Sequence, residues 1–326
     1  MSGAESLSGQ RVLVTGGSGF IGRHVVAVLS AAGADVRVVD VKPHPDPAVE
    51  IVQGDIADPE VIEAAFAGGV DSIVHLAAVT SVLRSLEHPE LTYRTNVAAT
   101  ALLLEGARKA GAGAFAFAST NAVTGPTEAP AITEAATLRP LTPYGSTKAA
   151  GEMLMSAYTA SYGVRCACLR LTNVYGLGMQ AKDSIVARLM RAIRTGGGFE
   201  IYGDGRQVRD YVNVSDVVRG FALALLNEAW QGPIVIGAGS SLSVLEVVEA
   251  VREITGAPLD VRHGPAKAGE MPAVIVDPSR AHAAGWSPQT SFRDGLAAVW
   301  DEWSRADVDA IRAGAAAAPV PAGGAS

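Results

Sequence analysis

Short apolar runs alternate with helical patterns along the first half of the chain. Five apolar runs are typical of buried strands in a parallel sheet: Arg11–Thr15, Asp35–Asp40, Asp71–Ala77, Gly113–Ser119 and Val164–Arg170. Four segments between them carry apolar residues at helical spacing: Gly19–Ala32, Asp58–Ala67, Pro89–Ala110 and Pro143–Tyr162. This alternation predicts an α/β fold with a doubly wound parallel sheet, which binds ligands at the C-terminal ends of its strands.

After Arg170 the pattern loosens into glycine-rich turns, short strands and helices, which predict a smaller second lobe. Val214–Leu226 and Gly232–Ile236 have the patterns of one more helix and one more strand that can return to the sheet. We therefore expect a first domain over 1–172 with return segments around 214–236. The second lobe then covers 173–213 and 237–308, and the low-complexity tail 309–326 is expected to be disordered.

Composition excludes several classes of protein. With 326 residues, 48% of them hydrophobic and 18% charged, the chain is globular rather than fibrous or disordered. Its net charge of −7 provides no overall positive field for nucleic acid or anionic lipid. The two cysteines, Cys166 and Cys168, suit neither a disulfide nor a zinc site, and the six histidines lack metal-ligand spacing. We expect a cytoplasmic protein without a metal, a membrane segment or a nucleic-acid partner.

A glycine-rich loop follows the first predicted strand and opens a helix. Gly16, Gly19 and Gly22 have the spacing that allows a tight turn, a close approach of backbone to pyrophosphate, and close packing of the helix on the strand. The helix N-terminus adds unpaired N–H groups and a positive dipole. This context predicts a dinucleotide site.

Two acids stand at the ends of the next strands. Asp40 lies where a carboxylate can bond both hydroxyls of the adenosine ribose and repel a 2′-phosphate, which favours NAD over NADP. The alternative for Asp40 is a solvated carboxylate at the end of a strand. Because Lys42 lies nearby, NADP also remains an alternative cofactor. Asp55 follows a further short strand, between the runs Asp35–Asp40 and Asp71–Ala77, where it can meet the adenine amino group or cap the helix beginning near Asp58.

A tyrosine and a lysine lie four residues apart at the start of a predicted helix. Tyr144 and Lys148 share one helix face, where the ammonium would lower the pKa of the phenol and make it a usable proton acceptor. Ser119 and Thr120 lie at the end of the predicted strand Gly113–Ser119, at the same edge of the sheet, and can complete a proton relay. The alternative for Tyr144 and Lys148 is an exposed pair on a helix surface, and the alternative for Ser119 and Thr120 is an ordinary turn after a strand.

Further motifs follow in order along the chain: His75–Ala78, Ser81 and Val82 with Ser85 and Pro89, Asn96, Arg170–Gly176, Tyr202–Val212, Gly269 and Glu270, Asp277, and Gly285–Pro288. With the glycine loop and the Tyr–Lys pair, this series resembles the extended short-chain dehydrogenase/reductase family, in particular nucleotide-sugar epimerases of the UDP-glucose 4-epimerase type. The resemblance extends from Arg11 to Trp303.

The resemblance implies a Rossmann-type domain that binds NAD and a mixed α/β lobe that binds a nucleotide sugar. It implies that Thr120, Tyr144 and Lys148 are catalytic and that Lys148 also holds the nicotinamide ribose. The implied cofactor contacts are Gly16, Gly19, Phe20, Ile21, Gly22, Asp40, Asp55, Ile56, Leu76, Ala77, Ala78, Asn96, Ser119, Tyr144 and Lys148. The implied substrate contacts are Thr80, Ser81, Thr120, Asn173, Arg209, Lys267 and Glu270.

Arg209 and Asn173 would meet the diphosphate of the substrate, because a guanidinium is a planar fork for phosphate oxygens. The alternative for Arg209 is an ion pair with Asp210 or Asp204 on the surface. The chain also departs from the family pattern, with Thr124 in place of a usual tyrosine and Lys267 in place of a common arginine.

The residues after Thr120 bear on the type of reaction. The family's 4,6-dehydratases have Asp-Glu there, whereas this chain has Asn121 and Ala122, which disfavours dehydration. We therefore expect an NAD-dependent 4-epimerase that works through a transient 4-keto-hexose on a UDP-hexose or UDP-hexuronate. The alternatives are a sugar-nucleotide ketoreductase or dehydrogenase with net redox, and a regulatory protein that binds the cofactor without chemistry.

The helices predicted over Pro89–Ala110 and Pro143–Tyr162 are rich in small and apolar residues on more than one face. They resemble the family's elements that pair into a dimeric four-helix bundle. We therefore expect a homodimer.

Overall fold

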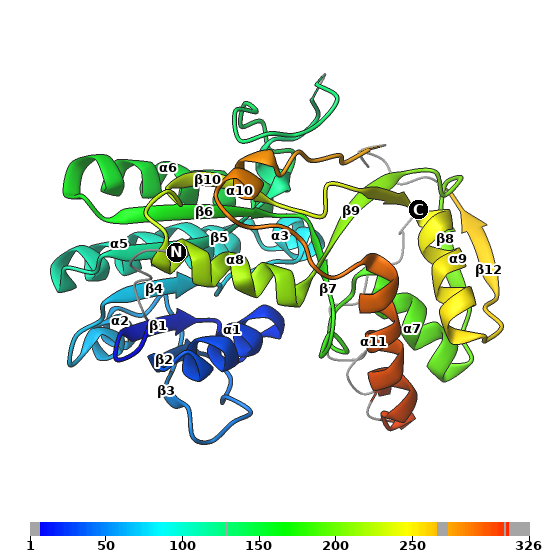
Figure 1. Ribbon diagram of the computed structural model, residues 1–326, viewed down its shortest axis with the longest axis horizontal. Helices are drawn as coiled ribbons and strands as arrows, with labels where there is room; N and C mark the ends of the chain where they lie inside the picture. The colour runs from blue at the N-terminus through cyan, green and yellow to red at the C-terminus, as the bar shows by residue number, and fades with distance from the viewer. Residues whose placement is uncertain (1–6, 128, 266–272, 310, 313–326) are drawn as a thin grey trace.

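A seven-stranded sheet forms the centre of the larger lobe (Figure 1). The computed structural model describes residues 7–127, 129–265, 273–309 and 311–312. Every pair of neighbouring strands in the sheet is parallel, in the order β10-β6-β5-β4-β1-β2-β3. Their bounds are β1 Arg11–Thr15, β2 Asp35–Asp40, β3 Glu50–Gln53, β4 Ser72–His75, β5 Ala114–Thr120, β6 Arg165–Leu171 and β10 Gly232–Ile236.

Helices cover both faces of this sheet. On one face, α1 (Phe20–Ala31) and α8 (Val214–Leu226) pack with the sheet in one apolar core. On the other, α2 (Pro59–Phe66), α5 (Ala99–Ala110) and α6 (Pro143–Tyr162) contribute to a second core. The predicted doubly wound α/β fold is therefore confirmed.

Two predicted elements differ from the observed ones. The strand expected over Asp71–Ala77 ends at His75, because the chain then turns over the glycine loop. The helix expected over Pro89–Ala110 is three consecutive pieces: α4 (Pro89–Tyr93), a π-helical turn η1 (Arg94–Ala98) and α5. The π turn contains Asn96, whose carbonyl accepts a hydrogen bond from the Thr100 hydroxyl (2.7 Å).

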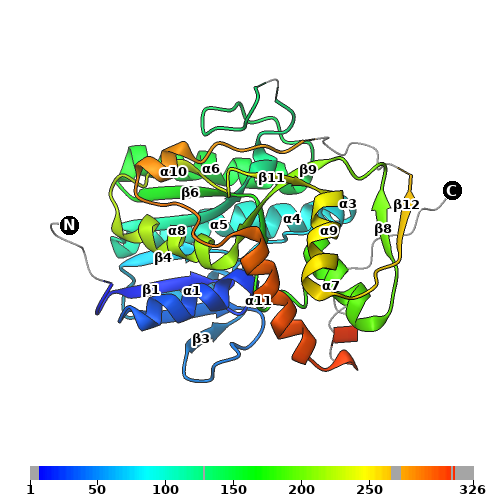
Figure 2. The same cartoon turned by 45° about the vertical axis from the view of Figure 1, so that its right-hand side comes forward.

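The second lobe is smaller and mixed (Figure 2). One three-stranded sheet contains β7 (Asn173–Tyr175), β9 (Val208–Asn213) and β11 (Ser241–Ser243), and β8 (Phe199–Tyr202) pairs with β12 (Val261–Gly264). Three helices pack into its apolar core: α7 Ile185–Thr195, α9 Val244–Thr255 and α11 Phe292–Arg305. Short helices connect the larger elements: α3 Val82–Glu87, η2 Asn121–Val123 and α10 Ser279–Ala283.

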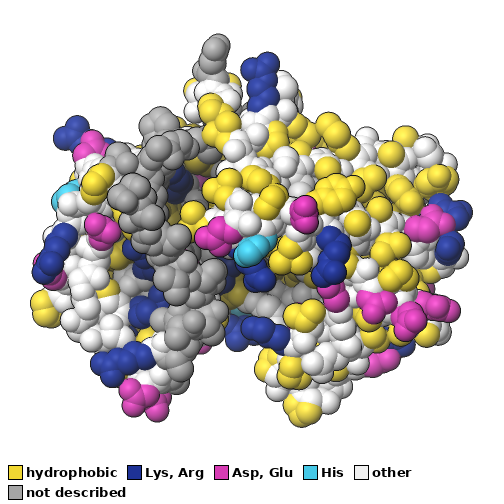
Figure 3. Space-filling model, turned by 180° about the vertical axis from the view of Figure 1, so that it is seen from behind, with side chains coloured by type: hydrophobic (Ala, Val, Ile, Leu, Met, Phe, Trp, Pro, Cys, Tyr) yellow, Lys and Arg dark blue, Asp and Glu magenta, His cyan; other side chains and the backbone are white. Residues whose placement is uncertain are grey.

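The molecule is notched between the two lobes when seen from behind, and Lys and Arg side chains lie at the head of this notch (Figure 3). The proposed boundaries of the two domains stay a prediction. Lys267, Glu270 and most of the tail 309–326 lie outside the described residues. Within the described ranges, no helix has both the length and the apolar character needed to cross a bilayer.

Candidate active site

A cavity of about 560 Å³ opens at the C-terminal ends of the central strands. Most predicted cofactor residues line it: Gly16, Gly19, Phe20, Ile21, Gly22, Asp40, Asp55, Ile56, Leu76, Ala77, Ala78, Ser119, Tyr144 and Lys148. The predicted substrate residues Thr80, Thr120 and Asn173 line it as well. One space thus brings together residues at the C-terminal ends of β1 to β6 and in the first two turns of α6.

The glycine loop is shaped so that only hydrogen fits at two of its positions. A Cβ on Gly16, where φ is +71°, would lie 2.7 Å from the backbone nitrogen of Ala77. A Cβ on Gly22 would overlap the Gly16 carbonyl. Among the described residues no side chain caps the start of α1, and its first turn has no acid. The free N–H groups and the close backbone fit the pyrophosphate of NAD.

Replacing Gly22 by Ala is expected to remove most of the bound NAD, because the added methyl would push the loop and α1 apart. NAD released from the denatured purified protein measures this directly. Gly113→Ala is the control, since a Cβ there meets no atom within 4 Å. Full NAD occupancy in Gly22→Ala would contradict the expectation.

Asp40 ends β2 beside the glycine loop. Its Oδ2 accepts a hydrogen bond from the Ser18 N–H and its Oδ1 accepts one from the Lys42 N–H, both at 3.0 Å. The carboxylate is therefore fixed against the loop rather than freely solvated, and it lines the cavity where an adenosine ribose would lie.

Asp55 does not cap α2. The capping residue is Asp58, which accepts from the Glu60 N–H. Asp55 accepts from the Ala57 N–H at 3.0 Å and forms an ion pair with Arg94 at 2.9 Å. The cap alternative is thus wrong for Asp55, and its carboxylate remains at the cavity wall.

The first two turns of α6 hold Tyr144 and Lys148. Thr142 caps the helix by accepting from the Gly145 N–H, and the Tyr144 N–H donates to the Ser85 hydroxyl at 3.2 Å. Lys148 is only 2% exposed, which excludes the alternative of an exposed helix pair. Burial raises the pKa of Tyr144 to about 12, against a lowering by its hydrogen bond with Thr120. Burial lowers the pKa of Lys148 to about 7.

Ser119 and Thr120 have different partners. Thr120 accepts from the Ala122 N–H and is hydrogen-bonded to Tyr144, so it both starts a turn and faces the phenol. The Ser119 hydroxyl donates to Glu152 at 2.5 Å. Glu152 also forms a buried ion pair with Arg170 at 2.8 Å.

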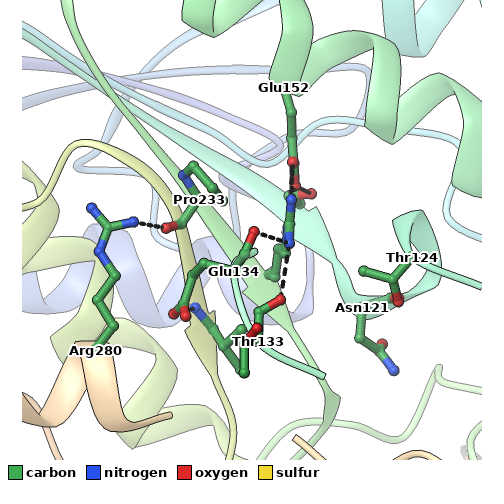
Figure 4. Close-up of polar contacts among 10 residues, drawn as sticks. Asn121, Thr124, Thr133, Glu134, Glu152, Pro233 and Arg280 are labelled. Atoms are coloured by element: carbon green, nitrogen blue, oxygen red, sulfur yellow. Dashed lines mark hydrogen bonds and ion pairs between the residues drawn. The ribbon is translucent and has the colours of Figure 1, made fainter. Parts of the chain in front are cut away.

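The Arg170 guanidinium also donates to the carbonyls of Thr133 and Glu134, which belong to the segment between β5 and α6 (Figure 4). Glu134 in turn accepts from the Val235 N–H in β10 at 2.8 Å. Arg170 therefore ties together β6, α6 and the segment that follows Thr120.

Two predicted site residues, Asn96 and Ser81, make hydrogen bonds to the backbone of neighbouring segments. Asn96 lies beside the cavity, and its amide accepts from the Val79 N–H and donates to the Val79 carbonyl and to Thr147. All its polar atoms thus serve to fix the loop after β4 and the first turn of α6. Ser81 accepts from the Arg84 N–H and caps α3.

A second cavity, of about 230 Å³, lies in the smaller lobe and shares Asn173, Val174 and Ser184 with the first. Arg209 lines it, and the Arg188 guanidinium lies over the rings of Phe199 and Tyr202. The carboxylates weighed as partners for Arg209 have other contacts, Asp210 with Thr172 and Asp204 with the Arg206 N–H. Asn173 donates to the Asp210 carbonyl at 2.9 Å.

Lys182 and Ser184 were missed by the sequence analysis. Lys182 lines the first cavity, with its Nζ 5.9 Å from the centre of the Phe20 ring. Ser184 begins α7 without capping it, and its buried Oγ has no hydrogen-bond partner among the described residues. A serine ahead of an amphipathic run is a helix-start signal that could have located the start of α7, but it does not say where that helix begins in space.

The loop before Lys182 is fastened to both lobes. Arg23 and His24 on α1 donate to the carbonyls of Gly178 and Leu177. Glu302 on α11 accepts from the Gly178 N–H at 2.8 Å. These contacts bring the start of α7 to the place where the two cavities meet.

Comparison with known proteins agrees with this fold. Residues 12–237 match the model of the NAD dependent epimerase/dehydratase family. The UDP-glucose 4-epimerase of Thermotoga maritima, solved with UDP-glucose, is 32% identical with a TM-score of 0.86, over 91% of this chain and 99% of that chain. The UDP-glucose 4-epimerase of Thermus thermophilus, solved with NAD, is 33% identical with a TM-score of 0.85, over 91% and 100%.

A dTDP-glucose 4,6-dehydratase of Streptomyces niveus is also 32% identical, over 90% of this chain and 93% of its own length. The relatives thus include both epimerases and dehydratases that act on nucleotide sugars. They confirm the predicted cofactor, NAD. By sequence, fold and cofactor site, the chain belongs to the NAD-dependent epimerase/dehydratase family.

Proposed function

We propose that this protein is a nucleotide-sugar 4-epimerase that works through a transient 4-keto-hexose, on a UDP-hexose or a UDP-hexuronate. The observation that carries the proposal is the convergence of Thr120, Tyr144 and Lys148 on a cavity that continues into a second one. In this proposal the cofactor and the sugar occupy the first cavity and the nucleoside occupies the second.

Tyr144 is the proposed proton acceptor for the hydroxyl on carbon 4 of the sugar. Its pKa is raised by burial, so the phenolate needs help from nearby positive charge and from hydrogen bonds. Lys148, one turn along the same helix, supplies the charge, and Thr120 supplies a hydrogen bond. NAD, when bound, reversibly accepts the hydride from carbon 4. When the hydride returns to the opposite face of carbon 4, Tyr144 gives its proton back to the oxygen on that carbon.

Between the two half-reactions the hexose ring must rotate to present its other face to the cofactor, while the diphosphate stays bound. Asn173 and Ser184 line both cavities, which supports a position for the diphosphate between them. Arg209 from the second cavity and Lys182 from the first supply positive charge there. The uncapped N-terminus of α7 adds N–H donors. Anchoring at this point leaves the hexose free to rotate.

A 4,6-dehydration needs an acid and a base near carbons 5 and 6 of the sugar. Asn121 and Ala122 follow Thr120 and can serve as neither. Among the described residues that line the first cavity, the carboxylates are Asp40 and Asp55, both at the β2–β3 end of the sheet. The local chemistry therefore favours epimerisation over elimination.

Proton NMR of the purified protein with UDP-, dTDP- and GDP-sugars, without added cofactor, tests the proposal. We expect the C4 epimer of one UDP-sugar to appear and no 4-keto-6-deoxy product. A 4-keto-6-deoxy product would make the protein a dehydratase. Turnover only with added NADH or NADPH would make it an oxidoreductase with net redox, and no conversion with bound NAD would reject this substrate class.

We also propose that the protein forms a homodimer through α5 and α6. Exposed apolar side chains on α6, with Met153 64% and Tyr162 56% exposed, support this pairing.

A further inference from the structure

The ammonium of Lys148 lies against the face of an aromatic ring. Its Nζ is 4.6 Å from the centre of the Phe117 ring, within the range of a cation–π interaction. Phe117 is fully buried in β5, three residues before Thr120. No hydrogen bond or ion pair to Nζ occurs within the part of the chain that the structure describes. The ring is therefore the protein group in place to support this charge.

Packing fixes the ring under the lysine. Gly151 on α6 lies so close that a Cβ there would be 2.6 Å from the Phe117 Cζ. On the other side, the His75 ring is 5.6 Å from the Phe117 ring and tilted by 32°. The ring is thus held between α6 and β4, and it cannot leave Lys148 without moving one of them.

The hydrogen bonds of His75 show which of its ring nitrogens carries the proton. Because the Thr100 hydroxyl donates to the Asn96 carbonyl, it accepts from His75 Nε2 (2.9 Å). His75 Nδ1 therefore accepts from the Thr15 hydroxyl (2.6 Å). Burial and then the charge of Lys148 lower the pKa of His75 to about 3. A neutral imidazole thus lies beneath Phe117, and no second positive charge competes with Lys148.

Other titratable groups near α6 are remote or already paired. Tyr144 shares the helix with Lys148, and Glu152 is paired with Arg170 on β6. Cys166 and Cys168, also on β6, are buried thiols with raised pKa values. β5, η2 and β10 have no titratable side chain. The remaining groups, Arg165 on β6 and those on α3, α4, η1 and α5, are surface or half-buried: Arg84, Glu87, Glu90, Tyr93, Arg94, Glu105, Arg108 and Lys109.

We propose that Phe117 is a positioning residue that stabilises the charged form of Lys148 through the face of its ring. The inference rests on the proposed role of Lys148 as the cation that favours the Tyr144 phenolate. Phe117 offsets part of the free-energy cost of burying the ammonium. It also keeps the Lys148 side chain in its position at the wall of the first cavity. A core phenylalanine thus acts on the reaction through the lysine above it.

The five lysines of the chain make the test direct. Lysine side chains labelled with ¹³C at Cε are titrated by NMR in the full-length protein at matched NAD occupancy, and the Lys148 signal is assigned by its loss in Lys148→Met. In Phe117→Leu, we expect the titration midpoint of Lys148 to fall by about one pH unit, the size expected for a desolvated cation–π contact. The midpoints of the other lysines should not move.

Phe115→Leu is the matched control. Phe115 is equally buried in the same strand and also contacts His75, with ring centres 6.1 Å apart. The substitution Phe115→Leu removes the same volume as Phe117→Leu but takes no ring face away from Lys148. The titration midpoint of Lys148 should therefore stay at the wild-type value. Equal shifts in the two variants, or none in Phe117→Leu, would overturn the inference.

A second substitution separates ring electrostatics from packing. Incorporating 3,5-difluorophenylalanine at position 117 weakens the negative face of the ring with little change in volume. The Lys148 midpoint should fall here too, and an unchanged midpoint would overturn the inference even if Phe117→Leu does not fold. The titration needs no turnover, so a shifted midpoint without epimerisation would reject the proposed function and leave this contact standing.

Discussion

Tyr144→Phe is expected to lose turnover by about 10²–10⁴-fold, the contribution of a well-placed general acid–base group. Phenylalanine keeps the ring volume but has no hydroxyl to take the proton from the sugar. The glycine loop and Asp40 are untouched, so NAD should still be bound at the wild-type level. Product formation by NMR and NAD release from the denatured variant measure the two quantities separately.

Tyr158→Phe is the control for this substitution. Tyr158 lies on the same helix, and burial and the nearby carboxylate of Glu105 raise its pKa, but it is outside the residues that line either cavity. Its loss of a hydroxyl should leave turnover unchanged. Retained turnover in Tyr144→Phe would rule out the phenol as the proton acceptor.

Arg170→Met is expected to cost about 3–5 kcal/mol in the free energy of unfolding, because it leaves the buried carboxylate of Glu152 without its cation. The side chains of the pair are 3% and 6% exposed, so water cannot replace the lost partner. The carbonyls of Thr133 and Glu134 lose a donor as well. Urea unfolding followed by circular dichroism measures the change.

The double variant Glu152→Met with Arg170→Met should be more stable than Arg170→Met alone, because no charge is then left buried. Arg262→Met removes an exposed pair with Asp260, whose side chains are 80% and 59% exposed. It should change stability by no more than about 0.5 kcal/mol. A cost for Arg170→Met as small as that for Arg262→Met would show that the buried pair adds nothing.

The sequence was most informative where local pattern decides structure. Four of the five predicted strands are confirmed to within one residue at each end, and two of these, β1 and β2, match their predicted bounds. A buried parallel strand is a short apolar run, which competing elements rarely imitate. The spacing of Tyr144 and Lys148 likewise fixes a shared helix face, because Pro143 and Thr142 set where the helix begins.

The residues that were missed depend on contacts between distant segments. Lys182 and Ser184 reach the cavity because Arg23 and His24 fasten the preceding loop, and no periodic pattern encodes that crossing. The π turn contains Asn96, which is bonded to Val79 in the loop after β4 and to Thr147 on α6. Local propensity alone predicts an uninterrupted helix there.

The order of the sheet affects how this protein is made. β10 pairs with β6 at the edge of the sheet, yet it follows α7, β8 and β9 in the chain. During synthesis, the outer edge of β6 therefore stays unpaired while much of the smaller lobe emerges from the ribosome. An open strand edge is a site for wrong pairing and aggregation. A fragment that stops at residue 172 lacks β10 and keeps this edge open, so we expect such a fragment to aggregate.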